Sequence, residues 1–559
     1  MAAPLIDRML ARYAPQMALD RAVARTRLGL AQQLDAMAGD IGGTQASMGG
    51  YTSTAGTDGF MARWSTRPRS AAADTLAQLP DQRGQARDLV RNNPIAASAV
   101  NTNVARAIGT GLAYSPQPHL ATLGWSAEQG AEWAAEVAAE FSLWADSPDC
   151  DWYGELNFYD LQDLVTRARL ESGDAFSVLP DGKRSAAMPY ALRVQVLEAD
   201  RVGNPAGKAD TADVAGGIRR GADGRVSGYH VYRRHPHGHW VGGVDRFAGD
   251  WIEPVGASGR RRMLHHFKRL RPEQPRGVPY LAPVMALFKL IGDYTDAEVK
   301  AAVVSAFLTL IIETPSGAGL PNIFGLQQPG PAPSGTSSQP QQAAPQDLAL
   351  GPAAVLGLAK GEKAEIVNPM RPNPQFGAFI DKVVDQLGAG LFIGPEMLMK
   401  KFNTSYTAAR AAFLDAWKHL LDVRTRTARD FCQPVLETWM AEAVAQRRIA
   451  APGFFTDPRL RWAYTRALWH GDSQGSLNPK DEVAAMRDAI DGRLTTHERA
   501  SWEIFGTDWR TVQPALAAEL QALERDGMAA PQQAGAPSAP QPSPAPAPGP
   551  APAPQEGDA

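Results

Sequence analysis

The sequence predicts an α+β protein in which helices surround an antiparallel β module. Three observations support this fold class. Apolar residues recur with a helical period through most of the chain. Between residues 175 and 267 the period changes to the alternation that is typical of short strands. The length of 559 residues, with 44% hydrophobic and 21% charged residues, is enough for roughly two to four packed units of a globular protein.

Charge, cysteine content and hydropathy exclude several classes of protein. The formal net charge is −3, so no general basic field draws the chain to nucleic acid. Cys150 and Cys432 lie far apart and form no CxxC motif, which favours two reduced cysteines. The N-terminal region lacks the uninterrupted apolar stretch of a secretory signal, and we interpret it as a basic N-terminal arm or helix. The most apolar run, residues 301–312, is too short to cross a bilayer, so no membrane span is expected.

The stretch RDLVRNNPIAASAVNTNVARAIGTGL, residues 87–112, predicts two helices separated by a short break. Asn93 is a good N-cap for the second helix, and Pro94 fits its first position, where the missing N–H costs no hydrogen bond. Gly109 and Gly111 supply the end of that helix. The stretch carries no recognisable catalytic motif, which indicates a structural role.

A third helix is predicted to begin after Ser126. Ser126 and Gln129 have the spacing of a capping box, in which each side chain bonds the other residue's backbone N–H. Helical periodicity then predicts a buried face that consists of Trp133, Val137, Phe141 and Trp144.

Four short apolar runs predict the antiparallel β module: residues 175–179, 190–198, 226–234 and 263–267. In the second run, Leu192 and Val194 alternate with Arg193, so we expect one buried face and one solvent-exposed face. Asp223-Gly224 marks a hairpin turn before the third run.

Helical periodicity returns after the β module. Residues 281–312 predict one helix of about 45 Å at the usual rise per residue. Residues 327–346 are a low-complexity segment rich in proline, glycine and glutamine, which we expect to be a mobile loop. A second amphipathic helix is expected around residues 375–390, with one apolar face made of Phe376, Phe379, Ile380, Val383 and Leu387.

A long helix is expected from about Ser405 into the 440s, with a kink at Pro434 because proline removes a helical hydrogen bond. Two or three further helices are expected up to Met528. Residues 529–559 are rich in proline and alanine and have hardly any large apolar side chain, so this tail is expected to be disordered.

One serine motif requires consideration. GDSQG, residues 471–475, matches G-x-S-x-G, but this motif activates its serine only on a tight strand-to-helix turn. Asn478-Pro479 delays the next helix beyond such a turn. Ser473 is therefore interpreted as a loop serine.

The remaining polar clusters do not predict a cofactor or metal site. His235, His237 and His239 alternate in HPHGHW, without an evident fourth ligand or rigid frame for zinc, so we expect a polar hairpin tip. The carboxylate pairs Glu171/Asp174 and Glu198/Asp200 have acid/base spacing, but carboxylates at strand edges near arginines are common. The chain has no P-loop motif. No catalytic residue, cofactor or metal ligand is assigned.

The stretch 87–112 resembles the N-terminal signature of the lambda-type bacteriophage portal proteins. Further blocks resemble consecutive segments of that family in the same order: ESGDAFSVL, VQVLEADRV, GIRRGADGRVSGYHVY and PEQPRGVPYLAPVMALFKLIGDYTDAE. FNTSYTAARAAFLDAWK is similar to the family's Asn-Tyr-Ser-Ser-x-Arg segment, with Thr404 interrupting the usual pattern. The resemblance covers about residues 60–525, and its specificity lies in the order of the blocks.

The resemblance implies the portal fold, with a helical stem and crown, an antiparallel β-rich wing and a small clip. In that plan the first half comprises an N-terminal arm and irregular lead-in (1–80), the wing (81–280) and the first stem helix (281–312). The second half comprises the clip (313–373, including the flexible insertion 327–346), the second stem helix (374–392), the tunnel loop (393–404), the long kinked helix (405–447), the crown-type helices (448–528) and the tail (529–559).

The function implied is that of a ring, usually of twelve subunits, at one vertex of the head of a tailed phage. Double-stranded DNA would be packaged and ejected through its channel. The implied partners are further copies of the chain, the terminase large subunit, a head-tail adaptor or connector, the major capsid protein and the scaffold. The implied location is the portal vertex of the virion, and the host cytoplasm during assembly. A near-neutral chain suits such a channel, because tight phosphate contacts would hold the DNA.

The same resemblance places the tunnel loop at the narrowest part of the channel. Lys400 and Lys401 would then form two rings of ammonium groups near the DNA, on flexible stems that make adaptable contacts. Asn403, Thr404 and Ser405 are plausible N-caps of the following helix and complete the set of candidate channel residues.

Two other classes of function remain open. A serine hydrolase that uses the GDSQG motif would require Ser473 to react with a fluorophosphonate probe. A different virion component, such as an adaptor or a capsid protein, would form a ring of another order or a shell.

Overall fold

The computed structural model describes residues 68–239, 245–307, 310–312, 355–357, 375–402, 405–473, 479–507 and 509–525. The chain divides into two units, Met1–Asp74 and Thr75–Ala559. Only residues 68–74 of the first unit are among the described residues, and the account below concerns the second unit. The N-terminal arm, the insertion 327–346 and the tail 529–559 lie outside the described ranges.

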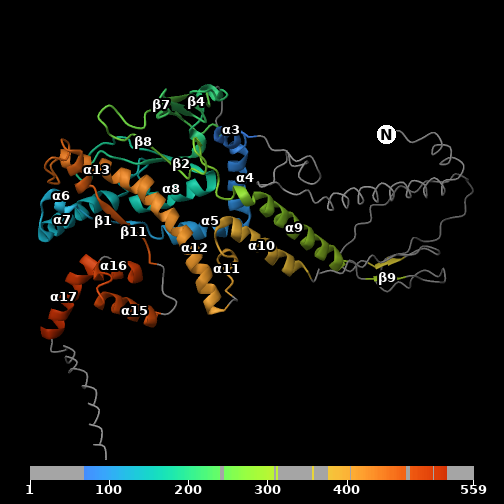
Figure 1. Ribbon diagram of the computed structural model, residues 1–559. Helices are drawn as coiled ribbons and strands as arrows, with labels where there is room; N and C mark the ends of the chain where they lie inside the picture. The colour runs from blue at the N-terminus through green and yellow to red at the C-terminus, as the bar shows by residue number, and fades with distance from the viewer. Residues whose placement is uncertain are drawn as a thin grey trace, which may run out of the picture. The chain divides into compact units, whose positions relative to one another are not determined.

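The described helices and strands are shown in Figure 1. The helices are α3 (Ala71–Leu76), α4 (Leu79–Asn92), α5 (Pro94–Ala107), α6 (Leu120–Leu123), α7 (Ala127–Ala145), α8 (Phe158–Ser172), α9 (Met285–Phe307), α10 (Phe376–Leu391), α11 (Pro395–Met399), α12 (Tyr406–Thr427), α13 (Gln433–Ala445), α14 (Pro458–Tyr464), α15 (Pro479–Asp491), α16 (His497–Ala500) and α17 (Trp509–Arg525). The strands are β1 (Ala113–Pro116), β2 (Asp174–Val178), β3 (Gln195–Leu197), β4 (Val214–Ala215), β5 (Ile218–Arg220), β6 (Val226–Tyr232), β7 (Gly249–Ile252), β8 (Met263–Phe267), β9 (Leu310–Ile312), β10 (Val355–Gly357) and β11 (Ala467–His470).

The break between α4 and α5 has the predicted capping geometry. The Asn93 side chain accepts hydrogen bonds from the backbone N–H groups of Ile95 (3.0 Å) and Ala96 (3.1 Å). Beyond α5, Gly109 and Gly111 have φ angles of +61° and +111°, which a residue with a Cβ rarely adopts. The two helices predicted for residues 87–112 and the glycine ending are therefore confirmed.

Helix α7 confirms the predicted third helix. The reciprocal capping box between Ser126 and Gln129 is present. The predicted face is buried: Trp133, Val137, Phe141 and Trp144 are at most 7% exposed. These side chains pack in the largest hydrophobic core cluster with aromatic residues of α8, α13 and β11.

The predicted β module consists of two antiparallel sheets, in the orders β3-β2-β8 and β4-β5-β6-β7. Gly224 has a φ of +77° in the predicted hairpin turn between β5 and β6. The second predicted strand is wrong in part, since only Gln195–Leu197 of residues 190–198 forms β3. The expected solvent-exposed face is also wrong at Arg193, which is buried because its guanidinium donates to the carbonyls of Tyr190, Leu192 and Lys183.

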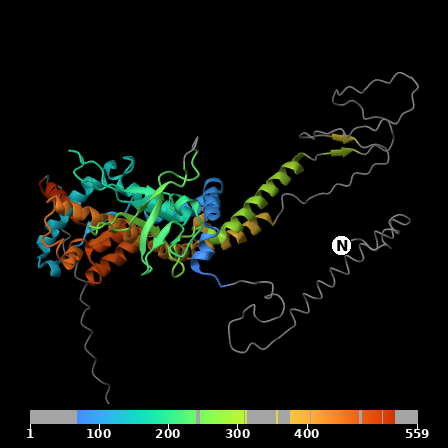
Figure 2. The ribbon, with the colours of Figure 1, turned by 90° about the horizontal axis from the view of Figure 1, so that it is seen from above.

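Helices α9 and α10 lie side by side (Figures 1 and 2), with the Tyr294 ring 5.1 Å from that of Phe379. The helix expected over 281–312 is wrong at both ends. It begins at Met285 after a 3-10 turn, and residues 310–312 form β9, which pairs in parallel with β10. Three consecutive Leu and Ile residues suit a strand, which explains the second error. In α10, Val383 and Leu387 of the expected apolar face are buried, whereas Phe379 is 42% exposed.

The long helix expected from about Ser405 is present as α12, a π-helical turn and α13, and the kink expected at Pro434 stays a prediction. Residues 428–432 form a π-helical turn between α12 and α13, directly before this proline, which has no N–H to donate. Both cysteines, Cys150 and Cys432, are free and buried, as expected of reduced cysteines. Across the described ranges, no helix combines the length and apolarity that a bilayer span requires.

Candidate functional site

The segment that joins α10 to α12 is a structured connection and not a simple turn. Phe392 and Lys400 have left-handed backbone conformations, with φ angles of 56° and 55°. Between them, Gly394 precedes the short helix α11, which the sequence analysis missed. Ser405 caps α12 by accepting a hydrogen bond from the Ala408 N–H at 3.4 Å, so it is the N-cap among the three predicted candidates. Asn403 and Thr404 lie outside the described residues.

Lys400 is attached to helix α5. Its Nζ donates to Thr102 Oγ1 at 2.6 Å. Partial burial, followed by the charge of Arg106, lowers the pKa of the Lys400 ammonium. Two residues earlier, the backbone carbonyl of Leu398 accepts a hydrogen bond from Ser98 Oγ at 2.7 Å. The end of α11 is therefore held against α5 by two polar contacts.

Lys401 has a different environment. Its side chain is exposed, and within the described residues its ammonium has no hydrogen-bond or ion-pair partner. Its backbone N–H is bonded to the carbonyl of Glu396 at 3.1 Å, so the residue itself is anchored. The adjacent Phe402 is 63% exposed. Both lysines are exposed, and of the two only Lys401 has an ammonium group without a partner among the described residues.

Helix α5 is the element that sequence reasoning did not connect with this loop. Ser98, Thr102 and Arg106 are spaced four residues apart, so they lie along one face of the helix. On the neighbouring face, Asn103 Oδ1 lies 3.0 Å from His419 Nε2 of α12. One sequence signal could have indicated this contact between α5 and the loop. It is the row of polar side chains, four residues apart, on a largely buried helix.

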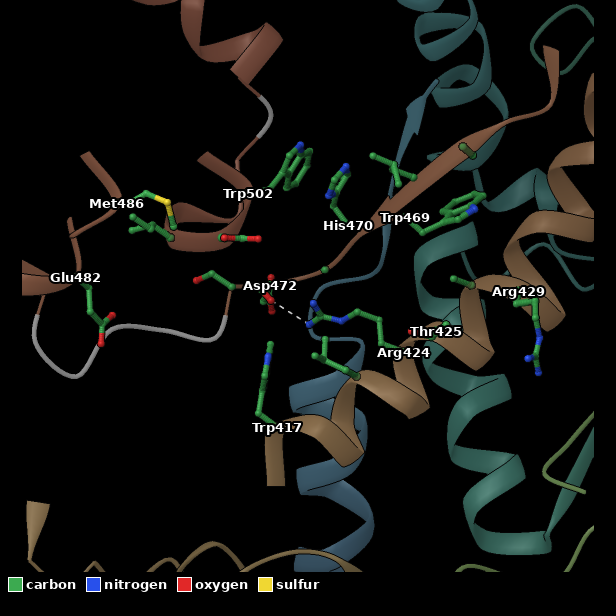
Figure 3. Close-up of a pocket in the computed structure, with 18 of the residues that line it drawn as sticks. Trp417, Arg424, Thr425, Arg429, Trp469, His470, Asp472, Glu482, Met486 and Trp502 are labelled. Carbon is green, nitrogen blue, oxygen red and sulfur yellow. Dashed lines mark hydrogen bonds between the residues drawn. The ribbon is translucent and has the colours of Figure 1, made fainter. Parts of the chain in front are cut away.

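Ser473 does not occupy a nucleophile elbow. Strand β11 ends at His470, and α15 begins only at Pro479, whereas an activated serine needs the helix to start at the turn itself. Figure 3 shows the cavity of about 1000 Å³ that these residues line, where the Arg424 guanidinium donates to the Asp472 carbonyl at 2.9 Å. The His470 ring stacks on Trp502 with centroids 3.7 Å apart.

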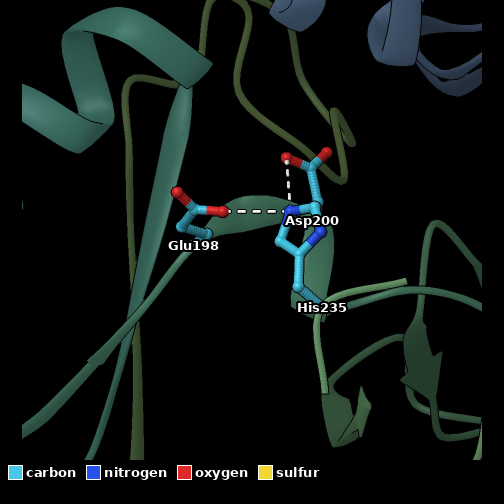
Figure 4. A group of neighbouring side chains, drawn as sticks. All are labelled: Glu198, Asp200 and His235. Atoms are coloured by element: carbon cyan, nitrogen blue, oxygen red, sulfur yellow. Dashed lines mark ion pairs between the residues drawn. The ribbon is translucent and has the colours of Figure 1, made fainter. Parts of the chain in front are cut away.

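His235 pairs with two carboxylates, Glu198 and Asp200 (Figure 4). Its Nε2 lies 3.0 Å from Glu198 Oε2 and 3.8 Å from Asp200 Oδ2. Asp200 also lies 2.5 Å from Arg87 Nη1 and 3.5 Å from Arg83 Nη1. Because two guanidinium groups already compensate this carboxylate, a divalent cation would be repelled, and we assign no metal to the group.

The histidine motif itself forms the expected polar turn. The Gly238 N–H donates to the His235 carbonyl at 3.1 Å after the end of β6. The pairing of His235 with residues from the other side of the module was not predicted, because it depends on how the two sheets meet.

Asp174 is the centre of a buried ionic cluster. It accepts hydrogen bonds from Arg83 Nη2 (2.7 Å), Arg276 Nε (2.5 Å) and His265 Nε2 (3.2 Å). Burial alone would raise the pKa of the Asp174 carboxyl, but Arg276 and Arg83 hold this pKa far below its usual range. A carboxylate so strongly ionised is suited to structural pairing and not to proton transfer.

Comparison with known proteins gives a consistent result. Residues 57–424 match the family model "Phage portal protein, lambda family". The chain is 23% identical over 501 residues to portal protein B of Escherichia phage lambda, which covers 86% of this chain and 91% of the relative. It is 25% identical over 456 residues to the portal protein of Escherichia phage N15, which covers 79% of this chain and 84% of the relative.

Among solved structures, a chain from the neck of a native gene transfer agent particle, computed with C12 symmetry, is 12% identical. The match covers 74% of this chain and 91% of that chain, with a TM-score of 0.36. This TM-score is too low for a comparison of individual elements.

Proposed function

The chain belongs to the lambda family of phage portal proteins, and from this premise we propose that its copies form a closed DNA channel at one vertex of a phage head. The ring repeats one heterologous contact around its axis, and the resemblance to the portal family supports about twelve copies. The two β sheets with α4 to α8 form its wing, α9 and α10 form its stem, and the helices after residue 447 form its crown.

Exposed apolar side chains on α9 support the ring. Leu290, Val299 and Val303 are 54%, 56% and 48% exposed. Val299 and Val303 are four residues apart and share one face of α9, and an exposed apolar face suits a contact with another protein. A neighbouring copy of the chain would cover them in a ring.

The partners in this proposal follow from the family. Double-stranded DNA passes through the channel during packaging and ejection. The terminase large subunit docks on the ring during packaging, and a head-tail adaptor or connector replaces it later. The major capsid protein and the scaffold surround the ring at the vertex, and assembly takes place in the host cytoplasm.

The loop of residues 393–404 lines the narrowest part of the channel. The observation that carries this proposal is the contrast between the two ammonium groups, because that of Lys400 donates to Thr102 whereas that of Lys401 has no partner among the described residues. Lys401 touches DNA phosphates, and Lys400 fixes the loop to α5. One exposed ammonium per subunit gives weak, salt-sensitive contacts that permit the DNA to slide.

A packaging assay with mutant portals tests this role. Lys401→Ala, alone or together with Lys400→Ala, is expected to leave rings intact in negative-stain images and to alter the packaging or retention of DNA. Lys382→Ala is the matched control, because Lys382 is an exposed lysine of α10 that pairs with Asp385. If intact Lys401→Ala rings package and retain DNA as wild type does, the assignment of this loop to the channel is wrong. The proposed portal function would not be affected by that result.

A further inference from the structure

Arg169 is a buried cation whose charge Asp430 and Asp422 compensate from a distance, without a direct ion pair among the described residues. It lies on α8 and is 7% exposed. Its Nη2 donates to the Val423 carbonyl at 3.4 Å, which is long for a hydrogen bond. Among the described residues, its guanidinium makes no other hydrogen bond and no ion pair, although the group has five N–H donors.

The carboxylates near Arg169 have other partners. Asp422 pairs with Lys268 Nζ at 3.1 Å and with Arg426 Nε at 3.0 Å. Asp430 pairs with Arg429 at 2.7 Å. Burial lowers the pKa of Arg169 to about 10, so the group remains a cation at neutral pH. A buried charge without a direct ion-pair partner is costly, and such groups concentrate at binding sites.

Arg169 lines a cavity of about 190 Å³, together with residues of α12 and of the segment that leads into α9. The charged residues of this lining are Arg169, Lys268, Arg426 and Asp422, so the cations exceed the anions by two. His419 also lines it, and burial lowers the pKa of its imidazole. The cavity is large enough for one small anion.

We propose that this cavity is a binding site for a tetrahedral oxyanion of the phosphate class. The guanidinium of Arg169 presents its free N–H groups to two oxygens of the anion, in the forked arrangement that suits phosphate. Lys268, whose side chain is 49% exposed, supplies the second cation at the mouth of the cavity. This site does not depend on the proposed role of Lys400 and Lys401.

Titration of the assembled protein with inorganic phosphate tests the site. Chloride at matched ionic strength controls for general screening, and binding is measured by calorimetry and by the shift in melting temperature. Wild-type protein is expected to bind phosphate saturably. Loss of a charge-assisted hydrogen bond predicts that Arg169→Gln weakens binding by about 10- to 100-fold.

Lys268→Ala is a second variant at an exposed position, where folding is not at risk. It is expected to weaken phosphate binding in the same direction as Arg169→Gln. Lys289→Ala, which removes an exposed lysine of α9 outside the cavity, is expected to bind as wild type does. Equal responses to phosphate and chloride, or wild-type affinity in both Arg169→Gln and Lys268→Ala, would overturn the proposal.

A competition experiment distinguishes two sources of the bound phosphate group, the DNA backbone and a free anion. If a short DNA duplex displaces inorganic phosphate from wild-type protein, the ligand is a backbone phosphate of DNA. If phosphate binding survives saturating duplex and still requires Arg169, the ligand is a free anion.

Discussion

Arg83 Nη2 lies 2.7 Å from Asp174 Oδ1, although the two residues are 91 positions apart in the sequence. The side chains are 6% and 0% exposed. This contact joins α4 to the central strand β2 of the three-stranded sheet, and Arg276 and His265 complete the cluster on the other side. The ion pair thereby sets the position of α4 on the β module, and α5 follows α4 after a single residue.

Removal of the central carboxylate is expected to be strongly destabilising. Asp174→Asn leaves the buried Arg276 without its counterion and leaves Arg83 with Asp200 alone at 3.5 Å, and the loss of one partner costs about 3–5 kcal/mol in comparable buried pairs. Denaturant unfolding measures the effect. The matched control is Asp250→Asn, since Asp250 pairs with Arg233 at the exposed surface and should leave the midpoint unchanged. Equal midpoints for the two variants would contradict the structural role of the cluster.

The folded protein should begin to lose stability at a pH well above the pKa values of carboxyl groups. Burial, assisted by His265, lowers the pKa of His266 to about 3 from an ordinary value of 6.5. The unfolded chain therefore takes up this proton first as the pH falls, so the stabilisation is complete above pH 6.5 and is lost progressively below it. The expected slope is at most about 1.4 kcal/mol per pH unit for each such group.

His266→Gln is expected to flatten this dependence between pH 6.5 and about 5, where carboxylates contribute little. Glutamine retains a polar group for Ser177 Oγ, which lies 2.9 Å from His266 Nε2. Burial also lowers the pKa of His265, so part of the slope should remain in the variant. Thermal or denaturant unfolding across this range measures the difference, and parallel curves for variant and wild type would refute it.

The cap of α5 should contribute measurably to stability. Asn93→Ala removes the oxygen that accepts from two backbone N–H groups, and the loss of such a cap costs about 0.5–2 kcal/mol. Asn93→Asp retains an acceptor at this position and is expected to retain most of the stability. Comparable losses in both variants would show that the cap is not the cause.

The exposed face of α9 should be required for ring formation. Val299→Asp places a charge on a residue that is 56% exposed in the single chain, so folding should be retained while the contact with a neighbour is lost. Light scattering and negative-stain imaging are expected to show smaller species. Leu494→Asp, at a position that is 85% exposed and outside α9, is the control. Wild-type rings from Val299→Asp protein would exclude this face from the subunit contact.

Thr102 should restrain the exposed side chain of Lys400 and the loop that carries it. Thr102→Val keeps the shape of the side chain and removes the hydroxyl that accepts from Lys400 Nζ. Trypsin, which cleaves after lysine, is expected to cut the variant faster at this position than wild type. Thr425→Val, at an exposed position of α12, should have no effect. Unchanged cleavage of Thr102→Val would indicate that the hydrogen bond does not hold the loop.

Several elements were predictable because their causes lie within a few residues of sequence. The Asn93 cap, the capping box of Ser126 and Gln129, and the hairpin glycine Gly224 each depend on backbone groups that are close along the chain. The amphipathic face of α7 was predictable because helical geometry alone decides which side chains share a side. The resemblance to the portal family could be recognised for the same reason, because it rests on short sequence segments that occur in the family's order.

Tertiary structure decided which polar residues are buried and which are free. Arg193 is buried because carbonyl groups of its surrounding loop accept its hydrogen bonds. Lys400 and Lys401 are adjacent and chemically identical, yet only Lys400 meets Thr102, nearly three hundred positions earlier. Arg169 makes no direct ion pair within the described residues, because Asp422 and Asp430 bind other cations. These outcomes depend on the distances and desolvation that packing creates between remote segments, and periodicity along the chain carries no information about them.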